Sequence, residues 1–166
     1  RLDQIPQAQS SLISFNPKTG EVLSYVGGSV FNDSQFDRVR QSYPQSGSVF
    51  KPFIYASAFS GGYNPSSLIN DAPIIFEDEN LETFWRPENY SGKFYGLTTL
   101  REALVQSINI VSIKLLREIG IKKSSETIDN FGFGSERLPQ DLSLALGSGN
   151  FSPAEVARGF SVFAND

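Results

Sequence analysis

The chain has 166 residues, enough for one domain with a hydrophobic core, and its formal net charge is −4. That charge, with no basic cluster to offset it, argues against nucleic acid as a partner, and no apolar run approaches the ~20 residues of a membrane-spanning helix. The chain contains no histidine and no cysteine, which excludes disulfides and thiol chemistry and removes the imidazole base of the usual serine nucleophiles. We expect no metal site, because zinc and the transition metals bind mainly through these two side chains, and we expect no cofactor.

The N-terminal part of the chain predicts a linker followed by a β-hairpin. Residues 1–9 are polar and have the composition of a linker or an entering strand. Strand-like segments at 10–15 and 21–26 flank the turn sequence Asn-Pro-Lys-Thr-Gly at 16–20. Both strands carry apolar residues on both faces, which predicts a sheet covered on both sides. Because a lone hairpin is not stable, we expect further strands after Asp166 and regard the chain as a piece of a longer protein.

The middle of the chain predicts one helix and one long connection. Apolar residues follow helical spacing over 48–59, with Pro52 in the first turn, where its missing N–H costs little. The glycine pair at 61–62 ends this helix. Residues 63–97 are rich in Asn, Pro, Gly and acidic residues and form a connection longer than ordinary loops, which predicts that it has a functional role.

The C-terminal part predicts helices that are marked by local start and stop signals. Thr99 with Glu102 and Ser152 with Glu155 are typical of capping boxes, and Pro153 favours the first position of a helix. The predicted helices cover 99–106, 110–119, 125–131 and 152–164.

Ser48 and Lys51 form the pair that bears most directly on chemistry. Residues three apart share one face of a helix. A lysine can replace imidazole as a base when burial or neighbouring cations lower its pKa. The spacing alone is weak, since about one Ser-x-x-Lys match is expected by chance in this composition. The alternative is that Ser48 caps the helix and Lys51 is a solvated residue of its first turn.

The sequence around this pair, RVRQSYPQSGSVFKPFIYASA at 38–58, resembles the active-site serine segment of class A penicillin-binding proteins. In that family a Gly-Ser-x-x-Lys-Pro-Phe core follows an arginine-containing loop. Further segments resemble the family in the same order along the chain. They are NPKTGEV at 16–22, WRPENY at 85–90, TLREAL at 99–104, QSIN at 106–109, LALGS at 144–148, SP at 152–153 and ARG at 157–159. The resemblance covers nearly the whole chain.

The resemblance implies roles for four residues. Ser48 would be the nucleophile and Lys51 its base. Ser107 and Asn109 would form the family's second motif, with Ser107 passing a proton to the leaving amine and Asn109 bonding Lys51 and the substrate amide. The alternative for the second pair is ordinary capping and loop bonding.

The resemblance also implies roles, or their absence, for residues outside these motifs. Trp85, Asn89 and Tyr90 would line the acceptor side of the substrate cleft, or else pack locally within their loop. The family's third motif, Lys-Thr/Ser-Gly, lies C-terminal to the other two. The Lys-Thr-Gly at 18–20 precedes Ser48 and has turn chemistry, so we interpret it as a hairpin turn and expect the third motif beyond Asp166.

The implied fold class is α+β, the penicillin-binding-protein and serine β-lactamase-like transpeptidase fold, in which an antiparallel sheet has helices on both sides. Residues 10–166 would be an incomplete transpeptidase domain, its N-terminal hairpin and helical part, which we expect to be inactive without the downstream strands. The implied reaction is D,D-transpeptidation: cross-linking of peptidoglycan stem peptides ending in D-Ala-D-Ala through a serine acyl-enzyme, with β-lactams as covalent inhibitors.

The implied location is the cell envelope, on the outer (periplasmic) face of the bacterial cytoplasmic membrane. In the family such a domain usually follows a glycosyltransferase domain and a membrane anchor, so we expect an anchor upstream of this chain. Two alternatives stay open. One is a D,D-carboxypeptidase or β-lactamase-like serine hydrolase, which the segments around Trp85 and Leu100 disfavour. The other is a β-lactam-binding sensor or scaffold; the retention of Ser107 and Asn109 makes a pure scaffold less favoured.

Overall fold

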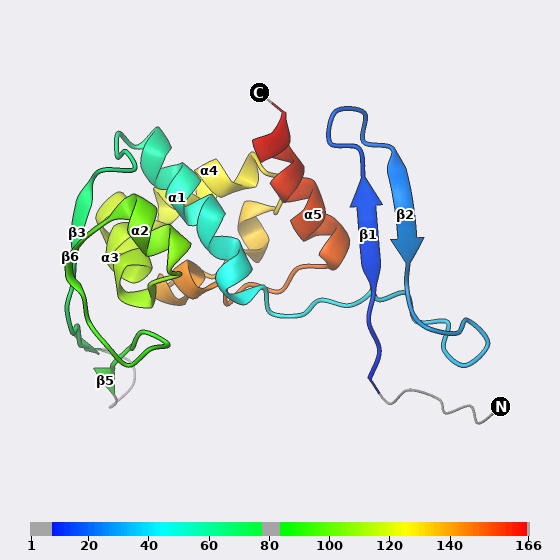
Figure 1. Cartoon of the computed structure of the whole chain (residues 1–166), viewed down its shortest axis with the longest axis horizontal. Helices are drawn as coiled ribbons and strands as arrows, with labels where there is room; N and C mark the ends of the chain where they lie inside the picture. The colour runs from blue at the N-terminus through cyan, green and yellow to red at the C-terminus, as the bar shows by residue number, and fades with distance from the viewer. Residues whose placement is uncertain (1–7, 78–83, 166) are drawn as a thin grey trace. The chain divides into compact units, whose positions relative to one another are not determined.

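The computed structural model describes residues 8–77 and 84–165, which divide into two compact units (Figure 1). The first unit contains the chain up to Gln45, the short stretch Phe131–Phe133 and the C-terminal part from Asn150. The second contains Ser46–Asn130 and Gly134–Gly149. The predicted linker lies almost entirely outside the described residues. Among the described helices, none combines the length and apolar composition needed to cross a bilayer.

The first unit is built on a β-hairpin and the C-terminal helix. Strands β1 (Leu12–Phe15) and β2 (Val22–Val26) pair antiparallel, and α5 (Pro153–Ser161) packs against β1. A 3-10 turn, η4 (Val162–Ala164), follows α5. The capping box at the start of α5 is confirmed, because the Ser152 hydroxyl accepts from the backbone N–H of Glu155, whose carboxylate accepts from that of Ser152.

The turn between β1 and β2 confirms the interpretation of the early Lys-Thr-Gly. The Asn16 side chain accepts a hydrogen bond from the backbone N–H of Lys18, and Gly20 donates to the carbonyl of Asn16. Gly20 has a φ of 73°, a conformation that favours glycine. Every residue of β2 is exposed within the described part of the chain, where α5 packs against β1, so the predicted covering of both faces of the hairpin stays a prediction.

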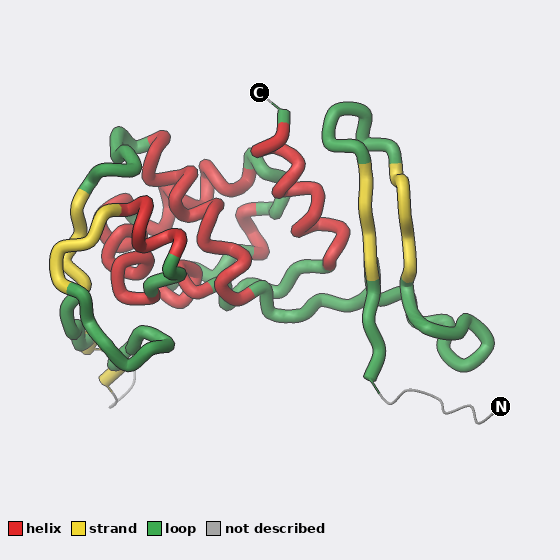
Figure 2. The backbone as a smooth tube through the Cα atoms, in the orientation of Figure 1, coloured by secondary structure: helices red, strands yellow, loops and turns green. Residues whose placement is uncertain are grey.

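The second unit is mainly helical (Figure 2). Its helices are α1 (Lys51–Ser60), α2 (Leu100–Val105), α3 (Asn109–Ile119) and α4 (Ile121–Asp129), joined by the 3-10 turns η1 (Gly47–Phe50), η2 (Ser135–Arg137) and η3 (Leu142–Leu146). α1 packs against α2, α3, α4 and η3, and α3 packs against η3. The fully buried apolar side chains at this centre include Phe53, Ile54, Ala58, Ile110, Ile113, Leu115, Leu116 and Leu144.

Local signals account for where these helices begin and end. Pro52 lies in the first turn of α1 and Gly61 is its C-cap, as the sequence predicts. The hydroxyl of Thr99 accepts from the N–H of Glu102 at the start of α2. α4 begins four residues before the predicted start at 125, because Gly120, with a φ of 91°, turns the chain directly from α3 into α4.

The long connection predicted over 63–97 contains short strands. It contains strand β3 (Leu68–Asp71), which pairs antiparallel with β6 (Gly96–Thr99), and the two-residue strands β4 (Phe76–Glu77) and β5 (Phe84–Trp85), which also pair. Residues 78–83 of this segment lie outside the described residues. These strands are only two to four residues long, and β3 is stabilised by a partner that is distant along the chain, so no local periodicity marks them.

Candidate active site

Ser48 lies in η1, which runs directly into α1, so Ser48 is one helical turn before Lys51. Its side chain is exposed, and among the described residues its hydroxyl has no hydrogen-bond partner. The residues that cap η1 and α1 are Ser46 and Phe50, and neither provides a side-chain cap. The capping alternative for Ser48 is therefore wrong, and its hydroxyl is available for chemistry.

The segment before Ser48 is attached to the loop after η3. Gly47 donates its N–H to the carbonyl of Gly147 at 2.9 Å, and Ser46 donates its N–H to the carbonyl of Gly149 at 3.0 Å. The Ser46 hydroxyl lies 3.2 Å and 3.1 Å from the same two carbonyls. Two residues that are about a hundred positions away thus determine where the chain enters the Ser48 turn.

Gly147 is the point of closest approach in this attachment. It adopts a left-handed φ of 70°, and a Cβ built on it would lie 1.9 Å from the Gly47 carbonyl oxygen. We expect Gly147→Ala to lower the free energy of unfolding by about 3 kcal/mol or more, because backbone atoms must separate and alanine is strained at this φ. Urea denaturation of the full-length protein measures the loss.

Gly20→Ala is the matched control, since Gly20 has a φ of 73° but no heavy atom within 4 Å of its Cβ position. Its cost should be only the conformational one, about 1 kcal/mol. Equal losses at the two positions would show that the close approach to Gly47 contributes nothing to stability.

Lys51 is buried, with 1% of its surface exposed, so the alternative that it is a solvated lysine is wrong. Its ammonium donates to the Ser107 carbonyl at 2.6 Å, to the Ser107 hydroxyl at 3.0 Å and to Asn109 Oδ1 at 2.8 Å. These acceptors account for all three N–H groups of an ammonium. The structure therefore brings three of the four residues of the predicted catalytic set into one hydrogen-bonded cluster.

Burial lowers the pKa of Lys51 to about 8. Removing an ammonium from water disfavours its charged form, and its three acceptors carry no formal charge that would compensate. A lysine whose pKa is close to neutral pH exists partly as the free amine, which can accept a proton.

Ser107 connects α2 and α3 in a strained conformation. It is the only non-glycine residue of the described part of the chain with a positive φ, at 54°. Such a conformation costs of order 1–3 kcal/mol and is frequent at functional sites. Here it allows both the carbonyl and the hydroxyl of one residue to face Lys51.

Asn109 is the first residue of α3, and both ends of its side-chain amide are engaged. Oδ1 accepts from Lys51, and Nδ2 donates to the Glu88 carbonyl at 2.9 Å. Neither Ser107 nor Asn109 caps a helix with its side chain: the N-cap of α3 is Ile108, which has no side-chain cap. Both side chains instead accept hydrogen bonds from Lys51.

The three residues predicted to line the cleft have different surroundings. Trp85 stacks on Phe76 across the β4–β5 pair, with ring centroids 5.2 Å apart. Tyr90 is fully exposed. Asn89 is buried, and its amide is engaged on both sides by Asp71, the Lys93 carbonyl and the backbone N–H groups of Asn109 and Ile110. Its amide therefore has no free donor to offer a substrate.

Asp71 and Glu88 belong to this cluster and were not predicted from the sequence. Asp71 is the last residue of β3 and is buried, while Glu88 contributes only its backbone carbonyl. In the sequence, the family-like WRPENY segment at 85–90 indicated that this loop matters, but it did not indicate which residues the loop contacts. Among the described residues no cluster of acidic side chains could hold a metal ion.

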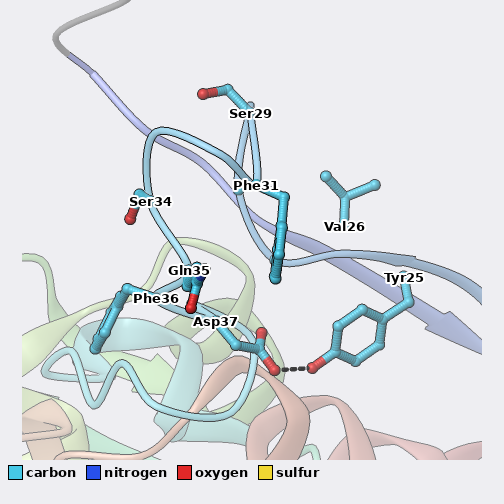
Figure 3. Close-up of a pocket in the computed structure, with 10 residues that line it drawn as sticks. Tyr25, Val26, Ser29, Phe31, Ser34, Gln35, Phe36 and Asp37 are labelled. Atoms are coloured by element: carbon cyan, nitrogen blue, oxygen red, sulfur yellow. Dashed lines mark hydrogen bonds between the residues drawn. The ribbon is translucent and has the colours of Figure 1, made fainter.

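The first unit contains an open hollow of about 480 Å³, which none of the predicted site residues lines (Figure 3). It lies beside the loop that follows β2. Tyr25 donates a hydrogen bond to the Asp37 carboxylate at its edge, and Phe31 and Phe36 contribute aromatic surface. Nothing about these side chains indicates a catalytic role.

Comparison with known proteins gives consistent results along the chain. The family model "Penicillin binding protein transpeptidase domain" matches residues 11–166. Penicillin-binding protein 1A of Pseudomonas aeruginosa is 49% identical over 165 residues, which are 99% of this chain and 20% of that protein. The chain thus spans about a fifth of the length of the curated relatives it matches.

Solved structures show the same likeness. The crystal structure of penicillin-binding protein 1A from Haemophilus influenzae matches with a TM-score of 0.94 and 39% identity, over 99% of this chain and 25% of that one. The PonA1 protein from Mycobacterium tuberculosis, solved in complex with penicillin V, matches with a TM-score of 0.80 and 20% identity. It covers 95% of this chain and 45% of that one, and it shares the fold.

Proposed function

The chain belongs to the transpeptidase-domain family of penicillin-binding proteins, with the predicted α+β fold, and from this premise we propose that it carries the nucleophile of a serine D,D-transpeptidase. The full-length protein would cross-link peptidoglycan stem peptides that end in D-Ala-D-Ala and would be acylated by β-lactams. The observation that supports this most directly is the buried Lys51 amine, held by Ser107 and Asn109, one helical turn after the exposed Ser48.

In the proposed acylation step, Ser48 Oγ attacks the carbonyl carbon of the penultimate D-alanine while its proton passes to neutral Lys51. The peptide bond to the terminal D-alanine then breaks, and this residue leaves as an amine that takes a proton from the site. The acyl-enzyme ester is next attacked by an amine of a neighbouring stem peptide, which releases Ser48. Two displacements of this kind replace one difficult step.

The contacts of Lys51 suit this proton transfer. A hydroxyl can donate or accept, so the Ser107 hydroxyl, which accepts from the ammonium at 3.0 Å, can donate to the lone pair of the neutral amine. Once Lys51 has taken the Ser48 proton, its ammonium donates to the Ser107 hydroxyl again, and this hydroxyl can give its own proton to the leaving amine as it receives one from Lys51. Asn109 Oδ1 keeps a second lone pair after accepting from Lys51, and this lone pair can receive the substrate amide N–H.

Ser48 would also stabilise the charge that develops on the carbonyl oxygen. It lies in the first turn of η1, where backbone N–H groups have no acceptor within the helix. Its own N–H is thus suited to donate to the oxyanion of the tetrahedral intermediate. The second oxyanion donor and the Lys-Thr/Ser-Gly motif remain predicted beyond Asp166, as do a membrane anchor upstream and a location on the outer face of the cytoplasmic membrane.

The acylation rate should increase with pH through the pKa of Lys51. Only the neutral amine accepts the Ser48 proton, and burial lowers this pKa to about 8. At pH 7 we therefore expect about a tenth of the plateau rate that is reached above the pKa. Rate constants for penicillin labelling of the full-length protein between pH 6 and 9.5, with circular dichroism to verify the fold, test this. A rate that is flat or falls with pH would exclude Lys51 as the base.

The proposed function itself is tested on the full-length protein with a fluorescent penicillin and with stem-peptide substrates. We expect one adduct by intact mass, located by peptide mapping on Ser48, and cross-linked product from donor and acceptor peptides. An adduct that is lost within minutes would indicate a β-lactamase-like hydrolase. A stable adduct without any cross-linking or carboxypeptidase product would indicate a sensor.

A further inference from the structure

Asn89 caps helix α3 from a distant part of the chain. Its Oδ1 accepts from the backbone N–H of Asn109 at 3.0 Å and from that of Ile110 at 3.1 Å. The residue that precedes α3, Ile108, has no polar side chain and makes no such bond. Asn89 therefore satisfies the N–H groups that a local serine or aspartate would normally satisfy.

Asp71 determines which way the Asn89 amide points. Both of its carboxylate oxygens lie 2.9 Å from Asn89 Nδ2, and Oδ2 also accepts from the backbone N–H of Tyr95 at 2.9 Å. An ionised carboxylate can only accept hydrogen bonds, so the NH₂ group must face Asp71. The oxygen of the same amide must then face α3.

The register of the β3–β6 pair places Asp71 at this point. Asp71 pairs with Gly96, adjacent to Tyr95, and only 1% of its surface is exposed. A buried carboxylate is costly unless hydrogen-bonded. Asn89 Nδ2 and the backbone N–H of Tyr95 supply these hydrogen bonds and hold the carboxylate in a fixed position inside the protein.

This series of hydrogen bonds continues through Asn109 to Lys51. Asn89 holds the backbone N–H of Asn109, and the neighbouring Glu88 carbonyl accepts from Asn109 Nδ2. With its backbone and one end of its amide held, Asn109 can present only Oδ1 to Lys51, at 2.8 Å.

We propose that Asp71 and Asn89 are positioning residues for acylation, acting through Asn109 to hold the Lys51 amine in its reactive place. This inference rests on the proposed function. It differs from the substrate contact expected for Asn89 from the sequence, because every bond of that side chain is made within the protein.

The test compares Asn89→Ala, Asp71→Asn and the double swap Asp71→Asn/Asn89→Asp in the full-length protein. Its readouts are the penicillin acylation rate as a function of pH and the melting temperature. We expect each single variant to acylate about tenfold more slowly or worse, because a small displacement of a reacting group has effects of that size. Asn70→Ala, an exposed side chain on the same strand, is the control and should keep the wild-type rate.

The double swap separates positioning from general stability. The carboxylate that it introduces at position 89 could accept from α3 and from the new amide at position 71. The oxygen of that new amide could in turn accept from the backbone N–H of Tyr95, so the link between β3 and α3 is restored with the charge moved toward α3, while the Lys93 carbonyl loses its donor. We expect the rate to recover above that of both single variants. We also expect the pH of half-maximal rate to increase, since a carboxylate closer to Lys51 favours its ammonium form.

The outcomes distinguish this inference from the function on which it rests. If wild-type protein is not acylated, the proposed function fails. If wild type is acylated and the single variants fold but match the Asn70→Ala control in rate and pH profile, only the positioning role is overturned. If the single variants do not fold, the swap decides: recovered rate with a shifted profile supports the role, while a folded swap without recovery overturns it.

Discussion

Ser48→Ala is expected to abolish labelling of the full-length protein by a fluorescent penicillin, with no adduct detectable by intact mass. In the described part of the chain, no other hydroxyl has a buried amine one helical turn after it that could accept its proton. Because the Ser48 side chain is exposed and bonds nothing among the described residues, we expect the free energy of unfolding to change by less than about 0.5 kcal/mol. The variant should thus lose penicillin labelling while its free energy of unfolding stays close to that of the wild type.

The matched control is Ser66→Ala, which removes another exposed hydroxyl from the second unit. It should label like the wild type. Residual labelling of Ser48→Ala at a measurable fraction of the wild-type rate would mean that a different residue is acylated. A large loss of stability would mean that the Ser48 hydroxyl has a structural partner outside the described residues.

Lys51→Met is expected to slow acylation by about 10³-fold, within the range that a general base contributes. Methionine replaces the buried aliphatic stem at similar length, so the packing of α1 is largely preserved. The Ser107 carbonyl and Asn109 Oδ1 lose their donor, which costs stability, whereas removal of a buried ammonium relieves a desolvation penalty. We therefore expect a much larger effect on rate than on the melting temperature.

Lys51→Arg tests whether the lysine is a base or only a donor. A guanidinium can still donate to Ser107 and Asn109 but does not lose its proton at accessible pH. We expect it to acylate as slowly as Lys51→Met and to lose the increase of rate with pH. Lys122→Met, at an exposed position of α4, controls for the change of charge. Near-normal acylation by Lys51→Arg would show that the site needs a cation rather than a base.

The sequence by itself determined those parts of the fold whose cause lies within one helical turn or one hairpin. The Ser152–Glu155 capping box, Pro52 at the start of α1 and Gly61 at its end occur where local chemistry places them. Each signal works through contacts between residues at most four apart, so it can be recognised without the rest of the fold. The spacing of Ser48 and Lys51 on one helical face is a result of the same kind.

The tertiary structure decided which residues, far apart in the sequence, meet at the site. The sequence alone does not indicate that β3 pairs with β6, because a strand partner is selected by packing and not by local propensity. Lys51 meets Ser107 and Asn109 across separations of 56 and 58 residues, and only the family resemblance suggested that meeting. The anchoring of Asn109 by Asn89 and Asp71 had no local signal at all: buried polar groups must find hydrogen-bond partners, but the folded chain decides which partners are within reach.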